Sequence, residues 1–247
     1  GNAGELSTTI EQYLDEAVAE TGPQPKALIV PHAGYIYSGP VAASAYVRLK
    51  PYGDQISRVI LLGPCHRVPV RGLALSGADV FRTPLGDAPL DKDVIASLEL
   101  PSVKVFDDTH AAEHSLEVQL PFLQMLLNEF TLVPLVVGDA AVETVAEMLE
   151  VLWGGPETLI VISSDLSHYL DYDAAKKRDQ ATCHAIEHFD ANSIGPEDAC
   201  GCRAIGGLLE LARRRGMTIE TLDLRNSDDT AGPMAQVVGY GAWMLLE

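Results

Sequence analysis

The hydrophobic pattern of the chain alternates between short, fully apolar runs and longer stretches in which apolar residues recur at helical spacing. Runs typical of buried strands occur at 26–30, 58–62, 72–76, 103–106, 131–137, 158–162, 218–224 and 236–246. Helices are predicted at 8–19, 41–49, 91–98, 141–152, 172–188 and 205–215, and an apolar helix that carries Pro121 follows the polar stretch 107–117. Buried strands that alternate with helices predict an α/β fold with helices on both faces of the sheet.

Local signals set the expected ends of these elements. Thr8 and Glu11 have the spacing of a capping box, so the first helix is expected to run to about Ala19. The segments 79–90 and 226–232 are rich in turn-forming or short polar residues, and we expect irregular structure in both.

Three predicted strands end in a histidine. His32 follows the first strand, His66 follows the second, and His168 closes the segment Ser-Ser-Asp-Leu-Ser-His that follows the strand at 158–162. Open α/β sheets bind their ligands at the carboxyl ends of the strands. One histidine at such a place commonly caps a loop, whereas three predict a shared polar site.

The residue types at this edge suit metal binding and proton transfer. A neutral imidazole is the commonest transition-metal ligand. Asp165 and His168 are three residues apart, so a helical turn after Ser164 would place them on one face as an acid–base pair. The alternative is that Asp165 caps a helix and His168 is a surface residue.

Cys200 lies just before the helix expected from about residue 205. A helix N-terminus and a bound cation both stabilise a thiolate, so Cys200 could complete a site of two histidines and one sulfur. Such a donor set with open positions is typical of non-haem iron or catalytic zinc. The alternative is that Cys200 is a small buried apolar residue.

The remaining histidines are less distinctive. The segment Glu113-His114-Ser115-x-Glu117 could line the same cleft, but we interpret its two glutamates as capping residues of a surface helix. The role of His114 stays open. We interpret His110, His184 and His188 as solvated helix or loop residues.

Composition narrows the functional class. A formal net charge of −18 repels phosphate backbones, so nucleic acid is not an expected partner. No apolar run is long enough to span a bilayer, and no signal peptide is recognisable, so no membrane association is expected. Four scattered cysteines predict a reducing, cytoplasmic location. A single domain over residues 1–247 is expected at this length.

Five ordered motifs resemble the Memo family, whose microbial members are called AmmeMemoRadiSam system protein B. The motifs are Pro-His-Ala-Gly-Tyr-x-Tyr-Ser-Gly from 31, Gly-Pro-Cys-His from 63, Glu-His-Ser-x-Glu-x-Gln-Leu-Pro from 113, Ser-Ser-Asp-Leu-Ser-His from 163 and Cys-Gly from 200. The family resembles LigB-type class III extradiol dioxygenases in fold. This implies a three-layer α/β/α sandwich around one mixed, mostly parallel sheet.

The resemblance also implies functional residues. It places metal ligands at His32, His66 and Cys200 and a catalytic pair at Asp165 and His168, with iron as the cofactor and copper or zinc as alternatives. The dioxygenases have a glutamate where this chain has a cysteine, which argues against catechol ring cleavage. Tyr37 is expected to line the cleft.

The expected function is a metal-dependent redox reaction on a small, unknown substrate. One alternative is a non-enzymatic protein that binds a peptide or a partner, and AMMECR-type and radical-SAM proteins are the partners that the resemblance implies. A second alternative is metal-assisted hydrolysis. Family members usually begin with an aromatic stretch that lines the cleft; here Ala3-Gly4 passes directly to Glu5-Leu6, so that wall is expected to be missing.

Overall fold

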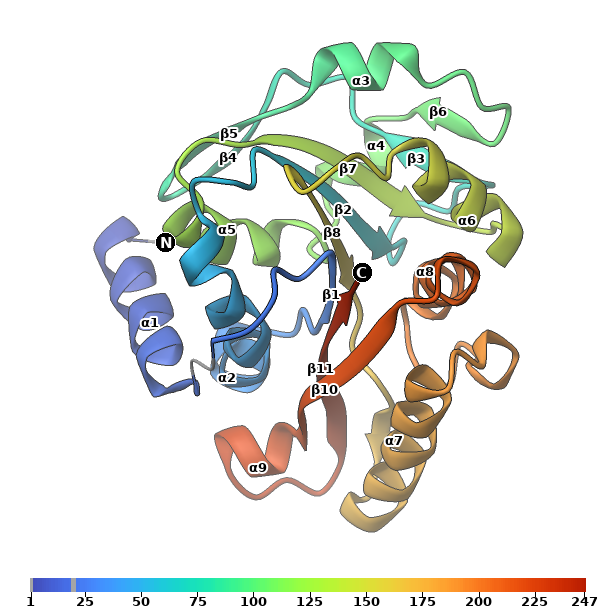
Figure 1. The fold of residues 1–247 in the computed structure, drawn as a ribbon. Helices are drawn as coiled ribbons and strands as arrows, with labels where there is room; N and C mark the ends of the chain where they lie inside the picture. Colours follow the sequence, from blue (N-terminus) through green and yellow to red (C-terminus); the bar gives the residue numbers. More distant parts are fainter. Residues whose placement is uncertain (1, 19–20) are drawn as a thin grey trace.

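The computed structural model describes residues 2–18 and 21–247. Within these ranges, nine strands form one sheet in the order β10-β11-β1-β8-β2-β7-β3-β6, with β9 paired to the start of β11 (Figure 1). The strands are β1 (Ala27–Val30), β2 (Arg58–Pro64), β3 (Leu73–Leu75), β6 (Val103–Val105), β7 (Thr131–Val137), β8 (Thr158–Ser163), β9 (His168–Leu170), β10 (Thr218–Asn226) and β11 (Val237–Leu246).

The centre of the sheet is parallel, and an antiparallel pair adjoins it on each side. β1, β8, β2 and β7 run in the same direction, whereas β11 and β3 run against their inner neighbours. Val30 is in register with Ser163, and Leu62 with Ile162. The chain segments that follow β1, β8 and β2 therefore leave the sheet side by side at one edge.

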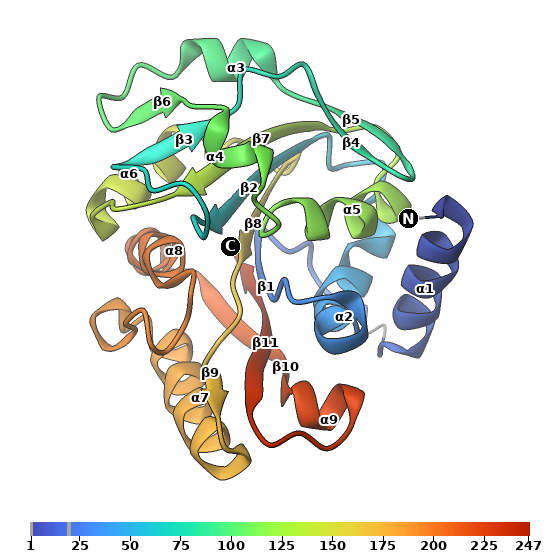
Figure 2. The same cartoon turned by 180° about the vertical axis from the view of Figure 1, so that it is seen from behind.

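Helices cover both faces of the sheet. α1, α2 and α5 lie on one face, and α6, α7 and α8 lie on the other, as the two opposite views show (Figures 1 and 2). This arrangement confirms the predicted α/β class and three-layer sandwich. The helices are α1 (Ala3–Glu16), α2 (Tyr35–Tyr46), α3 (Lys92–Ser97), α4 (Asp108–Ala111), α5 (Leu120–Leu126), α6 (Val142–Val151), α7 (Tyr172–Glu187), α8 (Cys202–Arg215) and α9 (Ser227–Ala231), with 3₁₀ turns η1 (Val47–Tyr52), η2 (Glu117–Gln119) and η3 (Ala191–Ser193).

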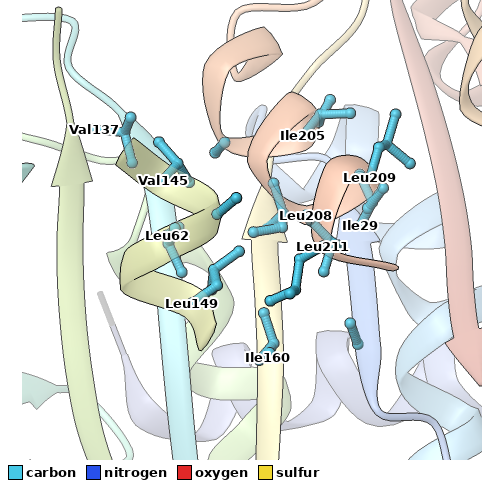
Figure 3. Packing of buried hydrophobic residues seen from close by; sticks show 14 of the residues in the cluster. Ile29, Leu62, Val137, Val145, Leu149, Ile160, Ile205, Leu208, Leu209 and Leu211 are labelled. Carbon is cyan, nitrogen blue, oxygen red and sulfur yellow. The ribbon is translucent and has the colours of Figure 1, made fainter. Parts of the chain in front are cut away.

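The central strands are apolar on both faces because each face is covered. In β1, Ile29 packs on the side of α6 and α8, whereas its neighbours Leu28 and Val30 pack on the side of α2 and α5. Figure 3 shows the first side, where Ile160 of β8 faces Leu208 and Leu211 of α8. This double burial explains why these strands appear in the sequence as continuous apolar runs.

α6 and α8 approach each other closely through glycines of α8. A Cβ atom at Gly207 would lie 2.4 Å from Cγ1 and 2.5 Å from Cβ of Val145, and one at Gly206 would lie 2.9 Å from Cγ2 of Val142. No real side chain tolerates such distances. Glycine is therefore needed at these positions for the observed helix–helix packing.

Several predicted boundaries were wrong. α1 begins at Ala3, because the side chain of Asn2 caps it by accepting a hydrogen bond from the N–H of Gly4 at 2.9 Å. It ends at Glu16, and the predicted end at Ala19 lies outside the described residues. α2 begins at Tyr35, six residues before the predicted start at 41, and includes Pro40.

Two segments predicted to be irregular are ordered. The segment 79–90 contains a hairpin of β4 (Val80–Thr83) and β5 (Gly86–Pro89), in which the facing residues Arg82 and Asp87 form a paired ion contact at 2.7 and 2.9 Å. The segment 226–232 contains α9, which Asn226 begins with a capping box. Among the described helices, none combines the length and apolar character needed to cross a bilayer.

Candidate metal centre

The three predicted metal ligands meet at the carboxyl edge of the parallel strands. His32 follows β1, His66 follows β2, and Cys200 lies just before α8. One donor atom from each side chain lies within 4.8 Å of the other two. The imidazole centroids of His32 and His66 are 5.3 Å apart at an interplanar angle of 71°. The fold thus brings together side chains from opposite ends of the chain.

A hydrogen-bond network sets the tautomer of His32. Its Nδ1 lies 2.9 Å from Oγ of Ser163, which donates to the carbonyl of Ser115 at 2.6 Å and accepts from Nε2 of Gln119 at 2.8 Å. Because the hydroxyl has only one hydrogen to give, Nδ1 must be the donor. Nε2 is then unprotonated, and it faces Sγ of Cys200 at 3.5 Å. Burial lowers the pKa of His32, so the ring is neutral at pH 7 and suited to bind a metal.

Glu113 orients His66 in the same way. Oε1 of Glu113 accepts from Nδ1 of His66 at 2.9 Å, and Oε2 accepts from the backbone N–H of His66 at 2.6 Å. The N–H groups of His114 and Ser115 also point at Oε1, at 3.0 and 3.1 Å. In the neutral ring, Nε2 of His66 is then the nitrogen available to a ligand. Our interpretation of Glu113 as a surface capping residue was therefore wrong, because its side chain is 1% exposed.

The pKa of Glu113 gives a pH-dependence prediction for the metal-free protein. Burial raises this pKa, but hydrogen bonds from His66 and Ser115 lower it by a larger amount. The net result is a pKa lowered from 4.5 to about 2. A carboxylate whose folded pKa is depressed stabilises the fold above its unfolded pKa, and this contribution is lost as the pH falls from about 5 towards 2. The shift corresponds to about 3 kcal/mol of unfolding free energy.

We therefore expect Glu113→Gln to flatten the acid limb of the stability profile. Urea denaturation between pH 3 and pH 7 should show a smaller loss of unfolding free energy for this variant than for the parent chain. Glu117→Gln is the matched control, since it removes an exposed carboxylate from the same segment. Parallel profiles for the parent chain and Glu113→Gln would contradict the prediction.

Cys200 supplies a thiol rather than a preformed thiolate. Burial, with the nearby charge of Asp165, raises the pKa of Cys200 to about 12. A bound cation would have to displace this proton. The residue is held against the end of β8, because its N–H donates to the carbonyl of Asp165 at 3.2 Å and the next N–H, of Gly201, donates to Oγ of Ser164 at 2.9 Å.

Asp165 and His168 do not form the predicted pair. Asp165 is buried, and its Oδ1 accepts from the backbone N–H groups of His32 at 2.7 Å and Ala33 at 3.3 Å. Residues 164–167 are irregular, and His168 begins β9, where it pairs with Val238. In the part of the chain that the structure describes, no hydrogen bond or ion pair joins the two side chains. The predicted helical turn was wrong, and the catalytic roles of the two residues stay predictions.

His114 lies against both candidate ligand histidines, His32 and His66. Its ring centroid is 5.0 Å from that of His66, in a stacked arrangement, and 5.6 Å from that of His32. Tyr37, by contrast, lies in the first turn of α2 and is 38% exposed. Its predicted place in the cleft stays a prediction.

A cleft of about 410 Å³ opens beside His66 and Cys200. Its walls come from residues 64–70, the end of β7 and the start of α8. Arg203 in this wall is paired with Asp139 at 2.8 Å, whereas the structure describes no ion pair for Arg67. The chain as a whole has a net charge of −18 and therefore repels anions. The positive charge of Arg67 makes this cleft a locally favourable place for an anion.

The chain is similar to curated proteins over most of its length. A MEMO1 family protein of Thermotoga neapolitana is 34% identical over 248 residues, covering 96% of this chain and 86% of that protein. A MEMO1 family protein of Aeropyrum pernix is 36% identical over 236 residues, covering 90% and 84%.

A solved structure and a family model complete the comparison. Uncharacterized protein JW3007 from Escherichia coli K12 matches with a TM-score of 0.49 and 13% identity, over 88% of this chain and 99% of that chain, which is too distant to bear on function. The model of Memo-like proteins matches residues 1–244. This chain therefore belongs to the Memo-like protein family.

Proposed function

We propose that this chain binds a transition-metal ion through His32, His66 and Cys200 and carries out a redox reaction on a small substrate in the adjoining cleft. The observation that carries the proposal is the hydrogen bonding of the two imidazole rings, which sets the tautomer of each. Both Nδ1 atoms donate hydrogen bonds, so in the neutral rings both Nε2 atoms are the ligand nitrogens, beside a thiol. Two nitrogens and one sulfur fit iron, copper or zinc, and iron is our first choice.

When bound, an iron or copper ion would supply one-electron chemistry and polarise a substrate group. The surrounding residues have separate tasks. Glu113 and Ser163 keep the two imidazoles in the ligand tautomer, and Asp165 fixes the backbone at His32. Arg67 would attract an anionic substrate into the cleft.

Proton transfer is a further part of the proposal. The ring of His114 stacks on that of His66, which supports a role in moving a proton to or from a substrate at the metal. The roles of His168 as a proton carrier and Asp165 as its orienting partner stay predictions, which His168→Ala would test.

Anaerobic loading with Fe²⁺, followed by measurement of oxygen uptake and superoxide, tests the proposed function. We expect the parent chain to hold one iron per site and consume oxygen, and His66→Ala to lose both properties. Cys65→Ser is the matched control, because Cys65 also borders the cleft but donates to the carbonyl of Val68 at 2.6 Å instead of joining the ligand group. Full iron occupancy without any oxygen uptake would overturn the redox proposal.

We also propose a cytoplasmic location, which is supported by the free thiols of all four cysteines, namely Cys65, Cys183, Cys200 and Cys202. Association with AMMECR-type and radical-SAM proteins stays a prediction. A pull-down with purified candidates of both types would test it.

A further inference from the structure

The end of α7 carries a second group of potential ligands, which shares no residue with the metal centre described above. His184, Glu187 and His188 have the spacing i, i+3 and i+4, so a helix presents them on one side. One donor atom from each side chain lies within 4.8 Å of the other two. The two imidazole centroids are 3.9 Å apart, and all three residues are exposed.

Hydrogen bonds already orient two of these side chains. Nδ1 of His188 lies 2.8 Å from the carbonyl of His184, and because a carbonyl can only accept, Nδ1 carries the hydrogen. In the neutral ring, Nε2 of His188 is therefore the nitrogen available to a metal. Oε1 of Glu187 accepts from Oγ1 of Thr221 in β10 at 2.7 Å, which ties the carboxylate to the neighbouring strand. Partners of this kind orient the ligands in known metal sites.

We propose that His184, Glu187 and His188 form a second binding site, for a borderline divalent ion such as Zn²⁺, Ni²⁺ or Cu²⁺. Two histidines at i and i+4 with a carboxylate supply the nitrogen and oxygen donors that these ions accept. The C-terminal end of a helix favours a cation, as does the net charge of −18. Because the group is exposed, water would complete the coordination. This inference does not depend on the proposed redox function.

Zn²⁺ binding to the chain of residues 1–247 provides the test, with His66→Ala as the background so that the first centre is removed. Equilibrium dialysis with zinc analysis should then find one ion per chain. Adding His184→Ala or His188→Ala should abolish this binding, and Thr221→Val should weaken it about tenfold by releasing Glu187. Lys176→Ala and Gln180→Ala alter the same helix outside the group and should leave binding unchanged.

The same measurements in a Cys200→Ser background guard against misfolding of the first variant. Co²⁺ provides an independent signature, because a site without sulfur lacks the sulfur-to-metal charge-transfer band that Cys200 would produce in the parent chain. That band should persist in His188→Ala. Zinc retained in the His66→Ala background by the variant lacking both His184 and His188 would overturn the second site, and so would the absence of any zinc in both backgrounds.

Discussion

Replacing Cys200 with serine is expected to lower the affinity for Zn²⁺ at the candidate metal centre by about 100-fold or more. Removing only a residue that hydrogen-bonds to a metal ligand commonly lowers the metal affinity roughly 10- to 100-fold. Here the ligand itself is removed. The measurement is isothermal titration in the His188→Ala background, so that the proposed site on α7 does not contribute. Cys202→Ser, which changes a nearby thiol outside the ligand group, should bind as the parent chain does.

Proton release provides a second readout of the same change. Because burial raises the pKa of Cys200 to about 12, the thiol is protonated at pH 7 and must lose that proton to bind a cation. The affinity should therefore rise about tenfold per pH unit near neutrality. Titrations in buffers of different ionisation enthalpy should count one proton fewer for Cys200→Ser. Equal proton counts and equal affinities would remove the thiol from the site.

The largest loss of stability is expected from Gly207→Val. The new side chain would collide with Val145 and force α6 away from α8, since even a Cβ atom would come within 2.5 Å of Cβ of Val145. Overpacking of this kind costs about 3 kcal/mol of unfolding free energy. Urea denaturation should show this loss, whereas Gly22→Val should have little effect because a Cβ at Gly22 meets nothing within 4 Å. Similar losses for both variants would contradict the packing argument.

The sequence was sufficient to predict the architecture and the closeness of His32 and His66, because both follow from local signals. Parallel strands covered on both faces appear as uninterrupted apolar runs, and the residues just after them must lie at one edge of the sheet. His32 and His66 were found in this way. For Cys200 the local signal was weaker, since only its position before a predicted helix indicated it. The family resemblance was needed to place Cys200 with His32 and His66.

The features that were predicted wrongly depend on contacts between residues far apart in the sequence. Residues 164–167 looked like the start of a helix, but the backbone that follows pairs with β11, as His168 does with Val238. Glu113 looked like a capping residue because its partner, His66, lies 47 positions earlier. The motif around Glu113 was the available signal, and a buried carboxylate that fixes a ligand tautomer could have been inferred from it.

The position of β1 has a consequence for the order of events during synthesis. His32 follows this strand, which lies between β8 and β11, whose residues emerge from the ribosome far later. Both sheet neighbours of β1 are thus made after it, and one of them, β11, is the described strand that lies farthest from it in the sequence. The surroundings of His32, and with them the group that it forms with His66 and Cys200, therefore depend on contacts between segments made early and segments made late.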